Sequence, residues 1–217
     1  MKINQIKLAI FDMDGTLCNT EDIHAKGWDD AFKHYGYDFG LDFVNSMRGK
    51  SIVDNNRVIT ERTGDPALTQ KMREYREAYI LEMIATNQVQ LMPGVREILE
   101  TLKEHNIPIA IATTSYTERA EKITGQLDIQ HYFSTKVYGD MITHQKPNPE
   151  IYLRVLEETG STLDGVIAIE DSPTGVTAAR SAGLKTYFIN DWLTLDIDDS
   201  EVTSYKNMHQ LLDELLS

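Results

Sequence analysis

The apolar residues of this chain fall into two patterns. Short runs that are apolar and rich in β-branched residues predict buried strands at residues 8–11, 107–112, 135–138, 166–169 and 186–189. Apolar residues spaced three or four apart predict helices at residues 95–105, 118–127, 149–159, 174–182 and 207–216. Strands that alternate with helices in this way indicate a parallel sheet with right-handed crossovers, covered by helices on both faces.

Residues 21–85 show only the helical pattern. Residues 68–85, for example, repeat apolar side chains at helical spacing with charged side chains between them. Ligands of open α/β sheets bind beyond the carboxyl ends of the strands, so an insertion that leaves from this edge would cover a ligand as a lid. The predicted domains are a Rossmann-like α/β core of residues 1–17 and 90–217 and an inserted all-helical cap of residues 18–89.

Two aspartates stand at the end of the first predicted strand. Residues 9–17 read Ala-Ile-Phe-Asp-Met-Asp-Gly-Thr-Leu, so Asp12 ends the strand and Asp14 lies in the loop that follows. Carboxylates this close repel each other unless a cation or a shared proton lies between them, which suggests a chemical role. A simple turn is the alternative interpretation, because Asp and Gly are common turn residues.

Polar residues also follow later parts of the predicted sheet. Thr113, Thr114 and Ser115 precede a helix, where hydroxyls and free backbone N–H groups would bind an anion or cap the helix. Lys146 stands before a proline, ahead of another helix. Glu170 and Asp171 stand at the end of the third strongly apolar strand.

These side chains would meet at one edge of the sheet and predict a cation there. Asp12, Asp14, Glu170 and Asp171 are carboxylates, and oxygen ligands in small number favour Mg²⁺. No His or Cys lies in these motifs, which argues against zinc. Lys146 would add positive charge where a phosphoryl group gathers negative charge.

Composition narrows the choice of partners and compartment. The 217 residues carry a formal net charge of -13, which argues against a nucleic-acid partner. The sequence has no apolar run of about 18 residues and no signal-peptide pattern at its start, so we expect no membrane association. Cys18 is the single cysteine, which fits a reducing cytoplasm. We expect a monomer that binds a small-molecule phosphate ester.

The strand-end residues together resemble the haloacid dehalogenase (HAD) superfamily, and within it the β-phosphoglucomutase-like phosphatases with a helical cap. The resemblance covers the chain nearly end to end. Its four signature motifs occur in order, as Asp12-Met-Asp14-Gly-Thr, Thr113, Lys146-Pro and Glu170-Asp171-Ser. True dehalogenases of the superfamily lack a carboxylate at the second position, so Asp14 indicates phosphate chemistry.

The resemblance implies a role for each of these residues. Asp12 would be the nucleophile that forms an aspartyl-phosphate, and Asp14 would be the general acid and base. Thr113, with the amide of Thr114, would hold the phosphoryl oxygens, and Lys146 would orient Asp12 and offset charge. Mg²⁺ would be bound by Asp12, the backbone carbonyl of Asp14, Glu170 and Asp171.

Inside the predicted cap, the resemblance points to substrate contacts. In β-phosphoglucomutases a cap arginine grips the far phosphate of the substrate, and Ile52 stands at that position here. Arg48 matches the cation that precedes this position in those enzymes, and Lys50 would compensate for the missing arginine. His24 and Arg76 are further candidates, although His24 is equally well explained as an ordinary helix histidine.

We therefore predict a Mg²⁺-dependent phosphatase that hydrolyses a small phosphorylated metabolite, such as a sugar phosphate, through an aspartyl-phosphate. Loss of the cap arginine favours a phosphatase over a mutase, because a mutase must bind a bisphosphate in two orientations. Phosphoryl transfer of the β-phosphoglucomutase type is the alternative. An inactive binding protein on the same fold is a more distant one.

Overall fold

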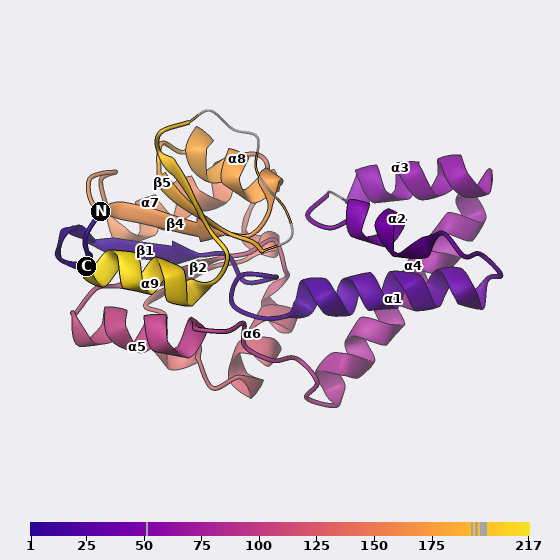
Figure 1. The fold of residues 1–217 in the computed structure, drawn as a ribbon, viewed down its shortest axis with the longest axis horizontal. Helices are drawn as coiled ribbons and strands as arrows, with labels where there is room; N and C mark the ends of the chain where they lie inside the picture. Colours follow the sequence, from indigo (N-terminus) through magenta and orange to yellow (C-terminus); the bar gives the residue numbers. More distant parts are fainter. Residues whose placement is uncertain (51, 192, 194, 196–198) are drawn as a thin grey trace. The chain divides into compact units, whose positions relative to one another are not determined.

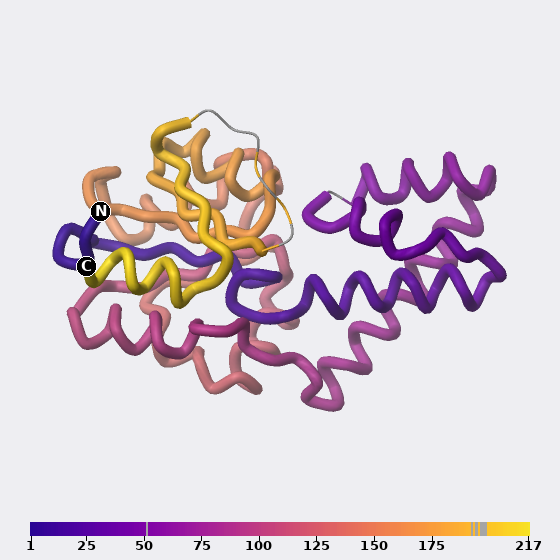
Figure 2. Tube along the Cα trace, viewed as in Figure 1, coloured from indigo at the N-terminus to yellow at the C-terminus, as the bar shows by residue number. Residues whose placement is uncertain are grey.

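The structure is a computed structural model that describes residues 1–50, 52–191, 193, 195 and 199–217. The chain divides into two compact units, which we call the sheet unit (Met1–Cys18 with Leu91–Ser217) and the helical unit (Asn19–Gln90). Figure 2 follows the chain through both units, from the indigo N-terminus to the yellow C-terminus. Among the described residues, no helix is long and apolar enough to cross a membrane.

One six-stranded parallel sheet forms the sheet unit and confirms the predicted α/β fold class. The strands, in the spatial order β3-β2-β1-β4-β5-β6, are β1 (Leu8–Phe11), β2 (Ile109–Ala112), β3 (Thr135–Val137), β4 (Val166–Glu170), β5 (Lys185–Ile189) and β6 (Val202–Tyr205).

Most strand ends lie within one residue of the predictions, and the two larger differences have physical reasons. Strand β2 begins at Ile109 rather than at residue 107, because the Ile107 N–H donates to Leu102 O and Pro108 has no N–H to give. Strand β6 was not predicted at all. It lies at the edge of the sheet and is mostly half-buried, so it lacks the apolar run of a central strand.

Helices connect the strands and cover both faces of the sheet. They are α5 (Val95–Glu104), α6 (Thr117–Gln126), α7 (Glu150–Thr159), α8 (Pro173–Ser181) and α9 (Met208–Leu216), with short 3-10 helices at Ile3–Gln5, Gln130–Tyr132 and Gly139–Met141. Figure 1 shows α7 and α8 on one side of the sheet and α5 and α9 on the other. Alternate strand residues such as Ile10 and Ala168 pack against Ile151 and Val155 of α7 in one buried cluster.

The helical unit contains α1 (Thr20–His34), α2 (Gly40–Ser46), α3 (Ile52–Thr63) and α4 (Pro66–Ala85), and its described residues form no strand. Its own core gathers Trp28, Phe32 and Met72 between α1 and α4. Helix α4 begins sharply because the Asp65 side chain accepts from the backbone N–H of Ala67 at 2.8 Å. The role of this unit as a cap stays a prediction.

Candidate active site

Two strand ends bring carboxylates to one edge of the sheet. In the central strand β1, Phe11 pairs with Ile111 of β2 and with Ile169 of β4. This parallel register sets Asp12, which follows β1, beside Glu170, the last residue of β4. The backbone N–H of Asp12 donates to Ile169 O at 3.0 Å and holds Asp12 in this place.

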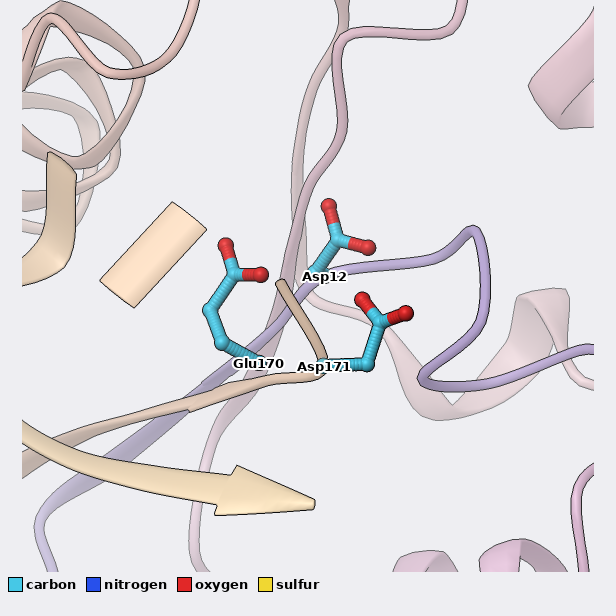
Figure 3. A group of neighbouring side chains, drawn as sticks. All are labelled: Asp12, Glu170 and Asp171. Atoms are coloured by element: carbon cyan, nitrogen blue, oxygen red, sulfur yellow. The ribbon is translucent and has the colours of Figure 1, made fainter. Parts of the chain in front are cut away.

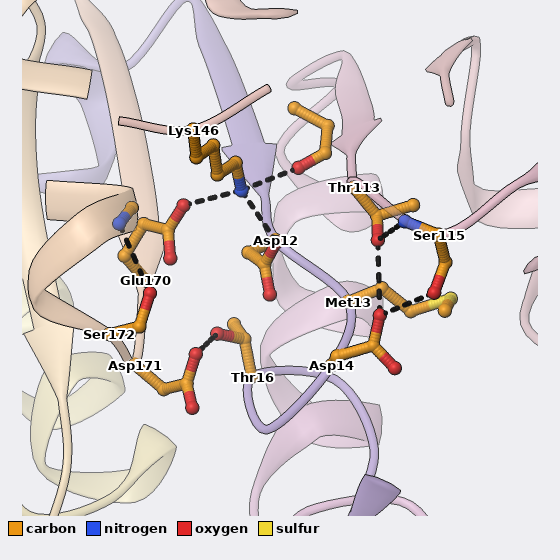
Figure 4. A network of polar contacts seen from close by, with 12 residues as sticks. Asp12, Met13, Asp14, Thr16, Thr113, Ser115, Lys146, Glu170, Asp171 and Ser172 are labelled. Atoms are coloured by element: carbon orange, nitrogen blue, oxygen red, sulfur yellow. Dashed lines mark hydrogen bonds and ion pairs between the residues drawn. The ribbon is translucent and has the colours of Figure 1, made fainter. Parts of the chain in front are cut away.

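Lys146 reaches this edge from the loop before α7. Its Nζ donates to Asp12 Oδ1 at 2.6 Å, to Glu170 Oε1 at 2.6 Å and to the backbone oxygen of Ala112 at 2.9 Å (Figure 4). These three acceptors use all three N–H donors of the ammonium group. Burial alone would lower the pKa of Lys146, but Asp12 and Glu170 raise it above its ordinary value. Lys146 is therefore a permanent cation that fixes the Asp12 carboxylate.

Three carboxylates gather beside that lysine. One oxygen each from Asp12, Glu170 and Asp171 lies within 4.8 Å of the other two, as Figure 3 shows for the side chains. All three residues are buried. Burial raises the pKa of Asp12 well above its ordinary value, Lys146 opposes this shift, and Glu170 and Asp14 add to it. The site therefore holds more buried negative charge than one lysine neutralises.

This arrangement fits a divalent cation. The donor set consists of carboxylate oxygens, which hard cations prefer. Glu170 Oε2 is buried and has no hydrogen-bond partner among the described residues. Thr16 Oγ1 donates to Asp171 Oδ1 at 3.3 Å and orients that carboxylate. No other group of three or more possible ligands occurs in the part of the chain that the structure describes.

The Asp14 carboxylate is not one of the three and is held by two hydroxyls (Figure 4). Thr113 Oγ1 donates to Asp14 Oδ2 at 3.2 Å, and Ser115 Oγ donates to the same oxygen at 2.8 Å. The Ser115 N–H in turn donates to Thr113 Oγ1 at 3.1 Å. Thr113 is buried and Thr114 is half-buried. Ser115 was predicted, with the two threonines, as an anion-binding or capping hydroxyl, but its hydrogen bond to Asp14 was not predicted.

The candidate cap residues all lie in the helical unit, where three of them have polar partners. Arg76 of α4 is buried, and its Nη1 contacts His24 Nδ1 of α1. Arg48 Nη1 forms an ion pair with Asp22 Oδ1 at 2.7 Å. Lys50 is exposed. The part these residues take in binding a substrate stays a prediction.

Comparisons with known proteins decide the family. A family model described as haloacid dehalogenase-like hydrolase matches residues 9–189, which is more than half of the chain. The chain belongs to the haloacid dehalogenase-like hydrolase family. This membership confirms the resemblance drawn from the four motifs.

Named proteins are similar to this chain over most of their length. A phosphorylated carbohydrates phosphatase from Thermotoga maritima is 32% identical over 84% of this chain and 84% of its own. The fructose-1-phosphate phosphatase YqaB from Escherichia coli is 30% identical over 81% of this chain and 92% of its own. A crystal structure of a Thermotoga maritima protein, provisionally described as a beta-phosphoglucomutase, has a TM-score of 0.70 at 28% identity, covering 97% of this chain and 100% of that chain. The names of the two phosphatases agree with the predicted class, a phosphoric monoester hydrolase.

Proposed function

We propose that this chain is a Mg²⁺-dependent phosphatase that hydrolyses a sugar phosphate through an aspartyl-phosphate on Asp12. The observation that carries this proposal is the pair of hydrogen bonds from Lys146 Nζ to Asp12 and Glu170, each 2.6 Å long. They fix Asp12 through Oδ1, so that Oδ2 is the oxygen we assign as the nucleophile. A second carboxylate, Asp14, stands two residues after Asp12 and is the group we assign to proton transfer.

The reaction proceeds in two displacements. In the first, Asp12 Oδ2 bonds to phosphorus, the bond from phosphorus to the ester oxygen breaks, and Asp14 gives a proton to the departing alkoxide. In the second, Asp14 takes a proton from water, the water oxygen bonds to phosphorus, and the bond to Asp12 breaks, releasing inorganic phosphate. Splitting one hard displacement into two is the benefit of covalent catalysis.

Hydroxyl and cationic groups of this chain would hold the transferring phosphoryl group. Thr113 and Thr114 stand at the loop before α6, and Thr113 Oγ1 would move from Asp14 to a phosphoryl oxygen when substrate binds. Lys146 supplies the positive charge that phosphoryl transfer needs.

Mg²⁺ would be held by the carboxylates of Asp12, Glu170 and Asp171 and by the backbone carbonyl of Asp14. When bound, the cation neutralises part of the charge that the phosphoryl oxygens carry. The donor set and its excess negative charge support this assignment.

The names of two relatives and the residues of the helical unit support the proposed substrate class. Two relatives are named for phosphorylated carbohydrates and for fructose 1-phosphate. We propose that residues 18–89 act as a cap and that His24, Arg48, Lys50 and Arg76 provide its polar and cationic contacts to the sugar. The single cysteine, Cys18, is buried and forms no disulfide, which supports our assignment to the reducing cytoplasm.

A metabolite screen tests the proposal. Sugar monophosphates, nucleotides and phosphopeptides are incubated with the chain and Mg²⁺, and inorganic phosphate is measured. We expect release from sugar monophosphates, loss of activity in EDTA, and poor rescue by Ca²⁺, which prefers a larger and looser coordination. Absence of phosphate release from every ester would refute the proposal. Isomerisation of β-glucose 1-phosphate faster than hydrolysis, stimulated by a bisphosphate, would identify a mutase instead.

A further inference from the structure

Tyr152 of α7 lies against Glu170 and has no part in the reaction described above. Its side chain is fully buried. Its hydroxyl donates to Glu170 Oε1, the same oxygen that accepts from Lys146 Nζ. The Tyr152 ring centroid lies 5.1 Å from Lys146 Nζ, a cation–π distance. One tyrosine thus touches both members of the Glu170–Lys146 ion pair.

The Glu170 carboxylate depends on these two donors for its orientation. Oε1 accepts from Tyr152 and Lys146, whereas Oε2 has no hydrogen-bond partner among the described residues. On the Oε2 side the carboxylate packs against Gly175 of α8, where a Cβ would lie 2.0 Å from Oε2. Without the tyrosine hydroxyl, Lys146 would be the single donor that fixes the torsion of this carboxylate.

The tyrosine hydroxyl is suited to this task. Burial raises the pKa of Tyr152 well above its ordinary value, and Glu170 and Asp12 raise it further, so the phenol keeps its proton. A protonated phenol can only donate to Glu170 Oε1, because Glu170 in its ionised form is an acceptor.

We propose that Tyr152 is a positioning residue: it fixes Glu170 and, through Glu170 and ring contact, aims the Lys146 ammonium at Asp12 Oδ1. Its effect on turnover rests on the proposed phosphatase function. Its effect on Lys146 does not, since that effect depends only on contacts among residues of the chain itself.

The substitution Tyr152→Phe removes the hydroxyl and leaves the ring. We expect kcat to fall about tenfold with KM within about twofold of wild type, because Lys146 and Asp12 act on the bond-making step rather than on substrate capture. The matched control is Tyr138→Phe. Tyr138 is also buried, and its hydroxyl donates to Glu121 Oε1 at 2.6 Å, outside the Asp12 network. A kcat of Tyr152→Phe equal to wild type, or an equal loss in both variants, would overturn the inference.

A second measurement needs no substrate. The buried Lys146 ammonium is bound to three acceptors, so its protons should exchange slowly with water and give a ¹⁵N–¹H signal. We expect exchange to accelerate at least about fivefold in Tyr152→Phe and to stay unchanged in Tyr138→Phe. Unchanged exchange in Tyr152→Phe overturns the positioning role even in an inactive chain, whereas a wild-type chain that releases no phosphate overturns the proposed function alone.

Discussion

Removing the Lys146 ammonium is the most direct test of how the site is held together. The substitution Lys146→Met keeps an unbranched side chain of similar length and deletes the charge. It removes the hydrogen bonds to Asp12 Oδ1 and Glu170 Oε1, each 2.6 Å long. The side chains of Asp12 and Glu170 are only 10% and 0% exposed, so water cannot replace the lost donors.

The expected loss of stability follows from that burial. Breaking a buried ion pair by removing one partner costs about 3–5 kcal/mol, because the other charge is left buried without compensation. Here one cation serves two carboxylates, so we expect the free energy of unfolding of the sheet unit to fall by an amount in the upper part of this range, about 4 kcal/mol.

The loss of stability caused by Lys146→Met should increase with pH. Burial already raises the pKa of Asp12, and Lys146 is the main opposing influence. Without Lys146 this pKa rises further, so the native state keeps a proton that the unfolded chain releases at its pKa of about 3.9. Native stability therefore decreases as pH rises between these two pKa values. We expect a smaller difference from wild type at about pH 5 than at about pH 8.

Hydrogen exchange of the amides in β1 and β4 measures the free energy of opening for the sheet unit separately from the helical unit. The matched control is Lys136→Met, since Lys136 Nζ pairs with Glu121 Oε1 at 3.1 Å but both side chains are partly exposed, at 26% and 37%. We expect this control to lose at most about 1 kcal/mol. Equal losses in the two variants, or a difference from wild type that grows on acidification, would refute the reasoning.

Three further predictions concern single residues. Asp12→Asn should slow phosphate release at least about a thousandfold. It should also raise the thermal unfolding midpoint at neutral pH without divalent cations, because the raised pKa of Asp12 means that its ionised form destabilises the native state; a lower midpoint would contradict this reasoning. Gly175→Ala places a Cβ 2.0 Å from Glu170 Oε2 and should lower the free energy of unfolding, measured by urea titration, by about 1–3 kcal/mol, and should also lower activity. Ser115→Ala removes the 2.8 Å hydrogen bond to Asp14 and should slow hydrolysis of alkyl phosphates about tenfold. The rate with p-nitrophenyl phosphate should not change, because its leaving group needs no proton; an equal loss of rate with both substrates would argue against Asp14 as the acid.

The sequence alone predicted the fold class and the residue types of the site. Central strands such as Val166–Glu170 are covered on both faces, so every position before the terminal polar residue must be apolar. Such an apolar run can be recognised in the amino-acid sequence. The edge strand Val202–Tyr205 was missed because half-exposed positions carry no such requirement. Asp12 and Lys146 were predicted as partners from a resemblance, not from any local signal.

Only the tertiary structure decided which atoms meet. Lys146 stands 134 residues from Asp12 in the chain, and their 2.6 Å hydrogen bond exists because β1 and the loop before α7 end at the same edge of the sheet. The link from Tyr152 to Glu170 depends on which face of α7 turns to the sheet, and the link from Ser115 to Asp14 on how two loops curl. Local sequence patterns report how deeply each residue is buried, whereas distances between side chains far apart in the chain follow from the packing of whole elements.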